Sequence, residues 1–128
     1  TAEAKGIPLI HEMARQNGDA KYMLARKGPK LYMQDILEVS VRSITTAREQ
    51  KLYLDGNDAK LMKGKRILII DDVISTGESL SALEELVRTA GGDICGRMCI
   101  LAEGDAIGRE DIIYLEPLPL FDRTGRPI

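Results

Sequence analysis

Two adjacent carboxylates at the end of an apolar run are the residues of this chain best suited to chemistry. Asp71 and Asp72 directly follow Ile67-Leu68-Ile69-Ile70, a run typical of a buried strand. Charge at the end of such a strand is costly unless a partner or a ligand offsets it. Open α/β sheets bind ligands at the carboxyl ends of their strands, so the pair predicts a ligand site.

The turn after the aspartates has the residue types of a phosphate site. Residues 75–79, Ser-Thr-Gly-Glu-Ser, precede an apolar pattern at helical spacing, and a helix N-terminus offers free amides and partial positive charge. Gly77 allows an anion to approach the backbone, and the hydroxyls of Ser75, Thr76 and Ser79 can donate. An ordinary capped helix would account for the hydroxyl residues and for Glu78, but not for the two aspartates. The Glu78 side chain is expected to point into solvent.

The elements needed to position this site alternate between helices and strands. Breakers and periodicity predict a helix over 6–16, a strand over 21–25, strands over 36–44 and 51–54 joined by a loop at 45–49, the strand before Asp71, a helix ending at 90–92, and strands over 94–101 and 112–115. This order predicts an α/β fold with a mostly parallel sheet flanked by helices, plus a hairpin flap.

Composition favours one soluble domain over residues 1–128. The chain has a net charge of −2 and 44% apolar residues, and it contains no run long enough for a membrane span. The near-neutral charge argues against a surface that coats nucleic acid. Cys95 and Cys99 are expected to share one strand face as two buried thiols of a reducing cytoplasm. His11 is the single histidine, so a zinc site is not expected, and His11 is taken as an ordinary helix residue.

The segment over 67–79 resembles the PRPP-binding signature of type I phosphoribosyltransferases, where PRPP is 5-phosphoribosyl 1-pyrophosphate. The shared features are the aliphatic run, two acids, a short spacer, then Thr76-Gly77 and a small hydroxyl residue. The likeness extends over nearly the whole chain and is greatest to the purine branch, in particular to the adenine enzymes. It implies phosphoribosyl transfer from PRPP to a purine base in purine salvage, giving a nucleoside 5′-monophosphate and pyrophosphate.

The resemblance also implies roles for the site residues. Asp71 and Asp72 would be the catalytic pair, holding the ribose hydroxyls and favouring the positive charge that develops on the sugar. The 5′-phosphate would bind Ser75, Thr76, Gly77, Glu78 and Ser79.

Three further segments match loops of the family. Residues 3–6, with Lys5 and Gly6, resemble the loop that wraps pyrophosphate, and Arg26, Lys27 and Lys30 resemble the basic stretch that grips the diphosphate. A solvated basic turn is the alternative for the second stretch, but a leaving group with several negative charges requires donors of this kind. Residues 43–54 resemble the flap that closes over the reacting centre.

The resemblance implies that Mg²⁺ binds mainly through the oxygens of PRPP rather than in a protein cage, so no protein metal site is expected. It also implies a cytoplasmic homodimer whose partners are PRPP and a purine base, without nucleic acid or membrane.

Two departures from the family pattern leave alternatives open. The adenine enzymes often carry a flap glutamate that assists proton movement on the purine, whereas Thr45 or Thr46 falls there and Glu49 comes later. Adenine is favoured as the base, with hypoxanthine, guanine and xanthine as alternatives, and a PRPP-sensing regulator without catalysis is the rival function.

The second departure concerns the start of the chain. Residue 1 falls about where the family's first sheet strand would end, so we expect the chain to lack that strand. The expectation is that these residues are a fragment or pair with a separate N-terminal piece of the same protein.

Overall fold

The computed structural model describes residues 1–41 and 50–128. Their helices and strands are, in chain order, α1 (Ile7–Asn17), β1 (Leu37–Val41), β2 (Gln50–Leu54), α2 (Gly56–Met62), β3 (Arg66–Ile74), α3 (Glu78–Thr89), β4 (Asp93–Glu103), the 3₁₀ helix η1 (Gly104–Gly108) and β5 (Ile113–Leu118). The part of the predicted flap that holds Thr45, Thr46 and Glu49 lies outside the described residues.

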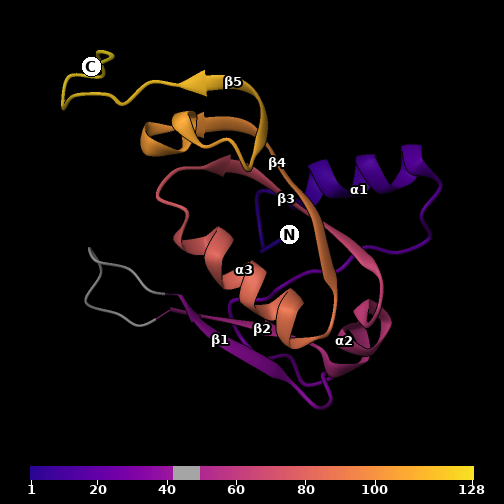
Figure 1. Ribbon diagram of the computed structural model, residues 1–128. Coiled ribbons are helices and arrows are strands. Elements are labelled where there is room, and N and C mark those ends of the chain that lie inside the picture. The colour runs from indigo at the N-terminus through magenta and orange to yellow at the C-terminus, as the bar shows by residue number, and fades with distance from the viewer. Residues whose placement is uncertain (42–49) are drawn as a thin grey trace.

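The described strands form two sheets. β3, β4 and β5 make a parallel sheet in the order β3-β4-β5, and β1 pairs with β2 as an antiparallel hairpin. Helix α3 lies between the parallel sheet and the hairpin, while α1 lies against β3 (Figure 1). The predicted α/β fold, mostly parallel and flanked by helices, is confirmed.

Helix α3 packs against both sheets because its buried apolar side chains lie on more than one face of the helix. The buried side chains are Leu80, Ala82, Leu83, Leu86 and Val87, and Leu86 packs in the same core cluster as Leu54 of β2. Burial of this much apolar surface outweighs the modest helix propensity of a 12-residue segment. The helix ends where Gly91 takes a φ of +83°, as the predicted stop at 90–92 requires.

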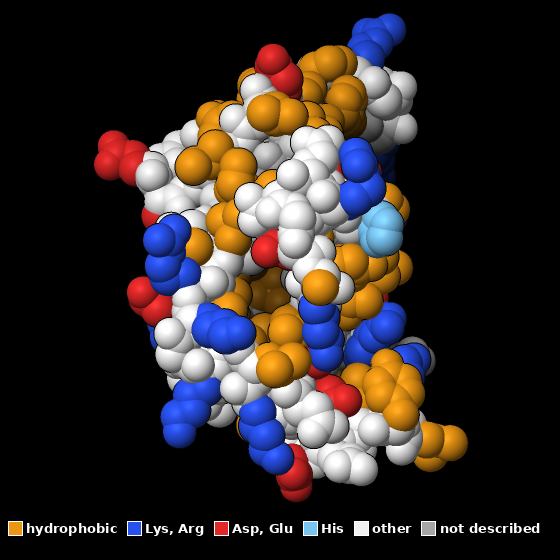
Figure 2. Space-filling model, turned by 90° about the vertical axis from the view of Figure 1, so that its right-hand side faces the viewer, with side chains coloured by type: hydrophobic (Ala, Val, Ile, Leu, Met, Phe, Trp, Pro, Cys, Tyr) orange, Lys and Arg blue, Asp and Glu red, His pale blue; other side chains and the backbone are white. Residues whose placement is uncertain are grey.

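A hollow of about 980 Å³ opens beside β3 of the parallel sheet. It is lined by α1, by residues 19–23 and by residues 66–70 of β3, and Figure 2 shows hydrophobic side chains at its floor with basic side chains around it. β3 pairs with β4 along the sheet, and its residues also face this hollow. The family's first sheet strand, which we expect this chain to lack, remains a prediction.

Two elements differ from the sequence-based expectation. Residues 21–25 do not form a strand: Ala25 makes an isolated parallel bridge to Ala2, and Arg26 makes an antiparallel bridge to Tyr53. Helix α2 was not predicted, because Asp55-Gly56 has the composition of a turn. Asp55 instead caps α2, its side chain accepting from the backbone N–H of Asn57 at 3.1 Å.

The expectation of two buried thiols on one strand face is wrong for Cys95. Cys99 is buried, but Cys95 is exposed. The reason is a register shift in the β3–β4 pairing: Ile67 pairs with Ile94 and Leu68 with Gly96, so Cys95 is the extra residue of a bulge. Burial raises the pKa of the Cys99 thiol.

Within residues 1–41 and 50–128, no helix combines the length and the apolar character that a membrane crossing requires.

Candidate functional site

A cavity of about 630 Å³ lies where the N-terminal loop, the β1–β2 hairpin and the end of β3 meet. The predicted site residues that line it are Lys5, Lys27, Asp71, Asp72 and Ser79, together with residues 2–4 and 50–53 and Val41. Carboxylates from β3, ammonium groups from two loops and a hydroxyl from the first turn of α3 therefore face one space. This combination suits a ligand that carries both sugar hydroxyls and phosphates.

The two aspartates lie within β3, not beyond it, because the strand continues to Ile74. Both are half-buried, and the backbone N–H of Asp72 donates to Oδ1 of Asp71 at 2.8 Å. Burial, followed by the hydrogen bond with the Asp72 side chain, raises the pKa of Asp71 to about 7. A cation or hydroxyl donors from a ligand would favour the ionised carboxylate.

The loop at 3–6 is tied to the basic segment by Glu3. Its backbone N–H donates to the carbonyl of Ala25 at 2.9 Å, and its carboxylate accepts from the backbone N–H of Lys27 at 2.6 Å and from Nη1 of Arg26 at 3.1 Å. These contacts, the Lys27 hydrogen bond first, lower the pKa of Glu3. The two loops that bring Lys5 and Lys27 to the cavity are thus held together by backbone hydrogen bonds to Ala25 and by the Glu3 carboxylate.

The three basic residues expected to grip a diphosphate differ in their surroundings. Lys27 is exposed and lines the cavity. Arg26 forms an ion pair with Glu3, so its charge is partly neutralised, and the sequence pattern carried no sign of that partner. Lys30 is exposed and is not among the residues that line the cavity.

Gly6 brings the N-terminal loop against the aspartates. It is buried, and a Cβ at this position would lie 3.5 Å from Oδ1 of Asp71 and would clash with Oγ1 of Thr1. A residue without a side chain is therefore needed for this close approach.

The turn at 75–79 has the backbone shape that its glycine predicts. Gly77 takes a φ of +83° and precedes α3, and the backbone N–H of Glu78 donates to Oγ1 of Thr76 at 3.4 Å. Ser79 lines the cavity, whereas Ser75 Oγ donates to Oε1 of Glu103 at 2.9 Å. Glu78 is half-buried instead of fully solvent-exposed. The Ser75 hydroxyl is thus engaged by a carboxylate, while Ser79 is the residue of this turn that lines the cavity.

Four residues near the site were missed by sequence reasoning. Lys51 and Tyr53 of β2 line the cavity, Glu103 binds Ser75, and Arg109 lies against Gly77. The alternation of β2 could have placed Lys51 and Tyr53 on one face. Glu103 and Arg109 carried no such signal, because their contacts with the turn depend on how β4 and β5 are placed in space.

The donor set fits a magnesium ion held mainly by its ligand. Among the described residues there is no group of three or more His, Cys, Asp or Glu side chains that could hold a metal ion. Asp71 and Asp72 nevertheless supply the hard oxygen donors that Mg²⁺ prefers, and Mg²⁺ commonly takes its other ligands from phosphates and water.

Comparison with known proteins agrees with this geometry. The phosphoribosyl transferase domain profile matches residues 2–116. The hypoxanthine/guanine phosphoribosyltransferase of Methanotorris igneus is 35% identical over 105 residues, covering 82% of this chain and 53% of that protein. The protein of the same name from Methanococcus maripaludis is 36% identical, with 82% and 52% covered. The chain thus spans about half the length of these curated relatives.

Solved structures with the same fold bear a different enzyme name. The adenine phosphoribosyltransferase of Thermoanaerobacter pseudethanolicus superposes with a TM-score of 0.78 at 22% identity, covering 91% of this chain and 67% of that one. That of Rhodothermus marinus gives 0.76 at 25% identity, with 91% and 66% covered. On the extent of the profile match, the chain belongs to the phosphoribosyl transferase domain family.

Proposed function

We propose that this chain transfers the phosphoribosyl group of PRPP to a purine base and releases pyrophosphate. The observation that carries the proposal is the single cavity that joins Asp71 and Asp72 to Lys5, Lys27 and the first turn of α3 at Ser79. Carboxylates and ammonium groups within one space match a sugar flanked by phosphates. Support also comes from the relatives, which are named hypoxanthine/guanine phosphoribosyltransferase or adenine phosphoribosyltransferase.

Each group has a role set by its charge. The 5′-phosphate binds the backbone amides at the start of α3, where the helix dipole favours an anion. Asp71 and Asp72 hold the ribose hydroxyls and stabilise the positive charge that develops on the sugar as the bond from C1 to pyrophosphate breaks. Lys5 and Lys27 stabilise the negative charge of the departing pyrophosphate, and a purine nitrogen bonds to C1.

Mg²⁺ belongs to this proposal as a partner of the ligand. When bound, it neutralises charge on the pyrophosphate oxygens. The ionised forms of Asp71 and Asp72 are the residues of this chain suited to hold its water shell. Because the pKa of Asp71 is raised to about 7, ligand binding is expected to be coupled to loss of its proton.

We propose that the base is a purine. Whether it carries an amino group or an oxygen at C6 is the question for the experiment below. Sequence resemblance favours adenine, as do the names of the structural neighbours. The relatives with higher identity are named for hypoxanthine and guanine, which support a 6-oxopurine at least as strongly.

The test is a panel of bases. The chain is incubated with PRPP and Mg²⁺ and with adenine, hypoxanthine, guanine or xanthine, and pyrophosphate and nucleoside monophosphate are quantified. We expect both products with at least one purine, and none with the Asp71→Asn, Asp72→Asn double variant. Tight PRPP binding without product for any base would identify a PRPP-sensing regulator instead. Failure to bind PRPP would contradict the proposal entirely.

A further inference from the structure

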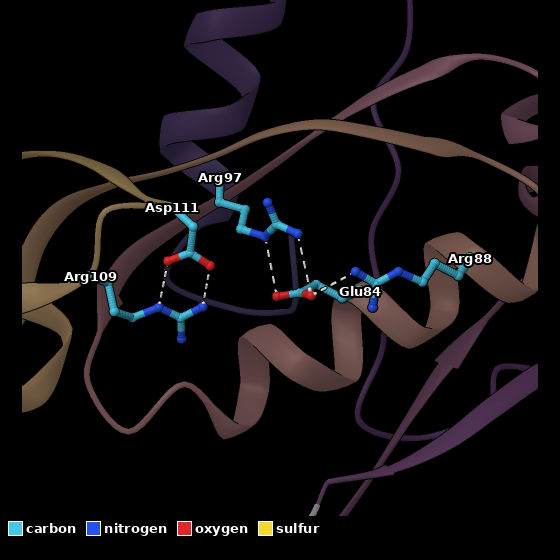
Figure 3. Close-up of polar contacts among 5 residues, drawn as sticks. All are labelled: Glu84, Arg88, Arg97, Arg109 and Asp111. Atoms are coloured by element: carbon cyan, nitrogen blue, oxygen red, sulfur yellow. Dashed lines mark hydrogen bonds and ion pairs between the residues drawn. The ribbon is translucent and has the colours of Figure 1, made fainter.

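Arg109 lies against the turn that leads into α3. Its Nε and Nη2 donate to Oδ1 and Oδ2 of Asp111 at 2.8 Å and 2.7 Å, a two-point ion pair that fixes the plane of the guanidinium (Figure 3). A Cβ on Gly77 would lie 2.6 Å from Nη1, the nitrogen that this ion pair does not use. The guanidinium thus occupies the space beside Gly77 that a side chain would need.

The same connection contacts the turn a second time. Glu103 ends β4, η1 follows, and Arg109 comes directly after η1. At the other end of the turn, Ser75 Oγ donates to Oε1 of Glu103 at 2.9 Å. The β4–β5 connection therefore touches the turn at its first residue and at its central glycine, with charges of opposite sign.

The charges around Arg109 keep it ionised and in place. Hydrogen bonds from Arg109 lower the pKa of Asp111 to about 2, and Asp111 raises the pKa of Arg109. Glu84 of α3 adds further negative charge nearby, while it accepts hydrogen bonds from Arg97 of β4 at 3.2 Å and 3.4 Å (Figure 3). The side chains of Arg109 and Asp111 are 31% and 47% exposed, so the pair is partly open to solvent.

We propose that Arg109 is a positioning residue for the phosphate-binding turn. Oriented by Asp111, its guanidinium holds the left-handed conformation at Gly77 and so keeps the amides at the start of α3 directed at the anion. Its positive charge also adds to the favourable potential around the phosphate. The inference rests on the proposed function only in requiring that this turn binds a sugar phosphate.

An ion pair that only stabilises the protein surface, away from the ligand site, would behave differently. Arg15 and Glu12 form such a pair within α1, and neither residue lines the cavity. Loss of a surface pair leaves ligand affinity unchanged. Loss of a positioning residue weakens a ligand held by the turn but not a ligand held by Lys5 and Lys27.

The test compares two ligands by calorimetry. Ribose 5-phosphate probes the turn, and inorganic pyrophosphate probes Lys5 and Lys27. For Arg109→Gln we expect about tenfold weaker binding of ribose 5-phosphate, because the turn loses a nearby positive charge and the group that holds Gly77, with pyrophosphate affinity unchanged. Arg109→Lys should recover part of the loss at low salt because it keeps the charge, and Asp111→Asn should weaken ribose 5-phosphate less than Arg109→Gln. Arg15→Gln is the matched control and should change neither affinity.

Two outcomes would overturn the inference: unchanged ribose 5-phosphate affinity in Arg109→Gln, or parallel loss of both ligands together with a fall in melting temperature in both Arg109→Gln and Arg109→Lys. Failure of the proposed function gives a separate result. Wild-type protein that binds ribose 5-phosphate but transfers to no base would refute the enzyme activity and leave the role of Arg109 intact. Wild-type protein that does not bind ribose 5-phosphate would refute both.

Discussion

Glu3 accepts a 2.6 Å hydrogen bond from the backbone N–H of Lys27, and this bond joins the two loops that carry basic residues to the cavity. The Glu3 carboxylate also pairs with Arg26 at 3.1 Å, so it meets both a backbone donor and a charge. This acidic side chain adds to the backbone hydrogen bonds of Ala25 in holding the loops of Lys5 and Lys27 together. The contact between Glu3 and Lys27 lies beside the cavity, so its role can be tested by mutating Glu3.

Replacing Glu3 should weaken both the fold and the grip on pyrophosphate. Glu3→Ala leaves the Lys27 N–H and the Arg26 guanidinium without this acceptor, which is expected to cost about 1–3 kcal/mol of stability and to raise the KM for PRPP. Urea unfolding and steady-state kinetics measure the two effects. Glu12→Ala, which removes an exposed ion pair on α1, should change neither. Unaltered stability and KM in Glu3→Ala would show that the two loops are held by other contacts.

Asp71 should make stability depend on pH. Its pKa is raised to about 7 in the folded protein, so the folded state holds this proton more tightly than the unfolded state. The resulting stability is fully present below the ordinary aspartate pKa of about 3.9 and is lost as pH rises through about 7. Asp71→Asn should therefore be more stable than wild type at pH 8, by roughly 1–3 kcal/mol after allowance for solvent at the half-buried site.

The measurement is urea unfolding of both proteins from pH 4 to pH 8. The difference between Asp71→Asn and wild type should shrink towards pH 4. Asp93→Asn, at the exposed first residue of β4, is the control and should follow the wild-type curve. A difference that is constant over the whole range would rule out the raised pKa.

The aspartate pair should matter more to catalysis than to folding. Asp71→Asn and Asp72→Asn each remove a carboxylate that stabilises charge in the transition state, so we expect kcat/KM to fall about 100-fold or more. Circular dichroism should confirm that both variants fold. Activity close to wild type in both would refute the role assigned to the pair.

Gly77 should be less tolerant of alanine than other glycines with positive φ. Gly77→Ala places a Cβ 2.6 Å from Nη1 of Arg109 in addition to the strain at a φ of +83°. Gly18 has a φ of +75° with nothing within 4 Å of a Cβ, so Gly18→Ala isolates the strain alone, roughly 1–2 kcal/mol. Thermal unfolding should show the larger loss for Gly77→Ala, and ribose 5-phosphate affinity should fall for Gly77→Ala only. Equal effects of the two substitutions would mean that Arg109 moves aside freely.

The unit from β3 to α3 could be predicted from sequence because its signals are local. The apolar run, the two aspartates, Gly77 and the helical spacing after it lie within a short stretch, and each residue type has a direct backbone consequence. The parallel character of the sheet, but not its strand order, could be predicted from the alternation of strands and helices.

The features of the site that could not be predicted depend on contacts between segments that are distant in the sequence. The pairing of Arg26 with Glu3 spans 23 positions and that of Ser75 with Glu103 spans 28, so no periodicity reveals them. The bulge at Cys95 reverses the face that simple alternation assigns to it. These features set the surroundings of Arg26, Ser75 and Cys95.

The most direct measurement is a crystal structure of the chain soaked with a purine nucleoside 5′-monophosphate. The account predicts the phosphate on the backbone amides at the start of α3 and the ribose hydroxyls within hydrogen-bond distance of Asp71 and Asp72. A nucleotide bound elsewhere, or a cavity closed by the protein's own side chains, would contradict it.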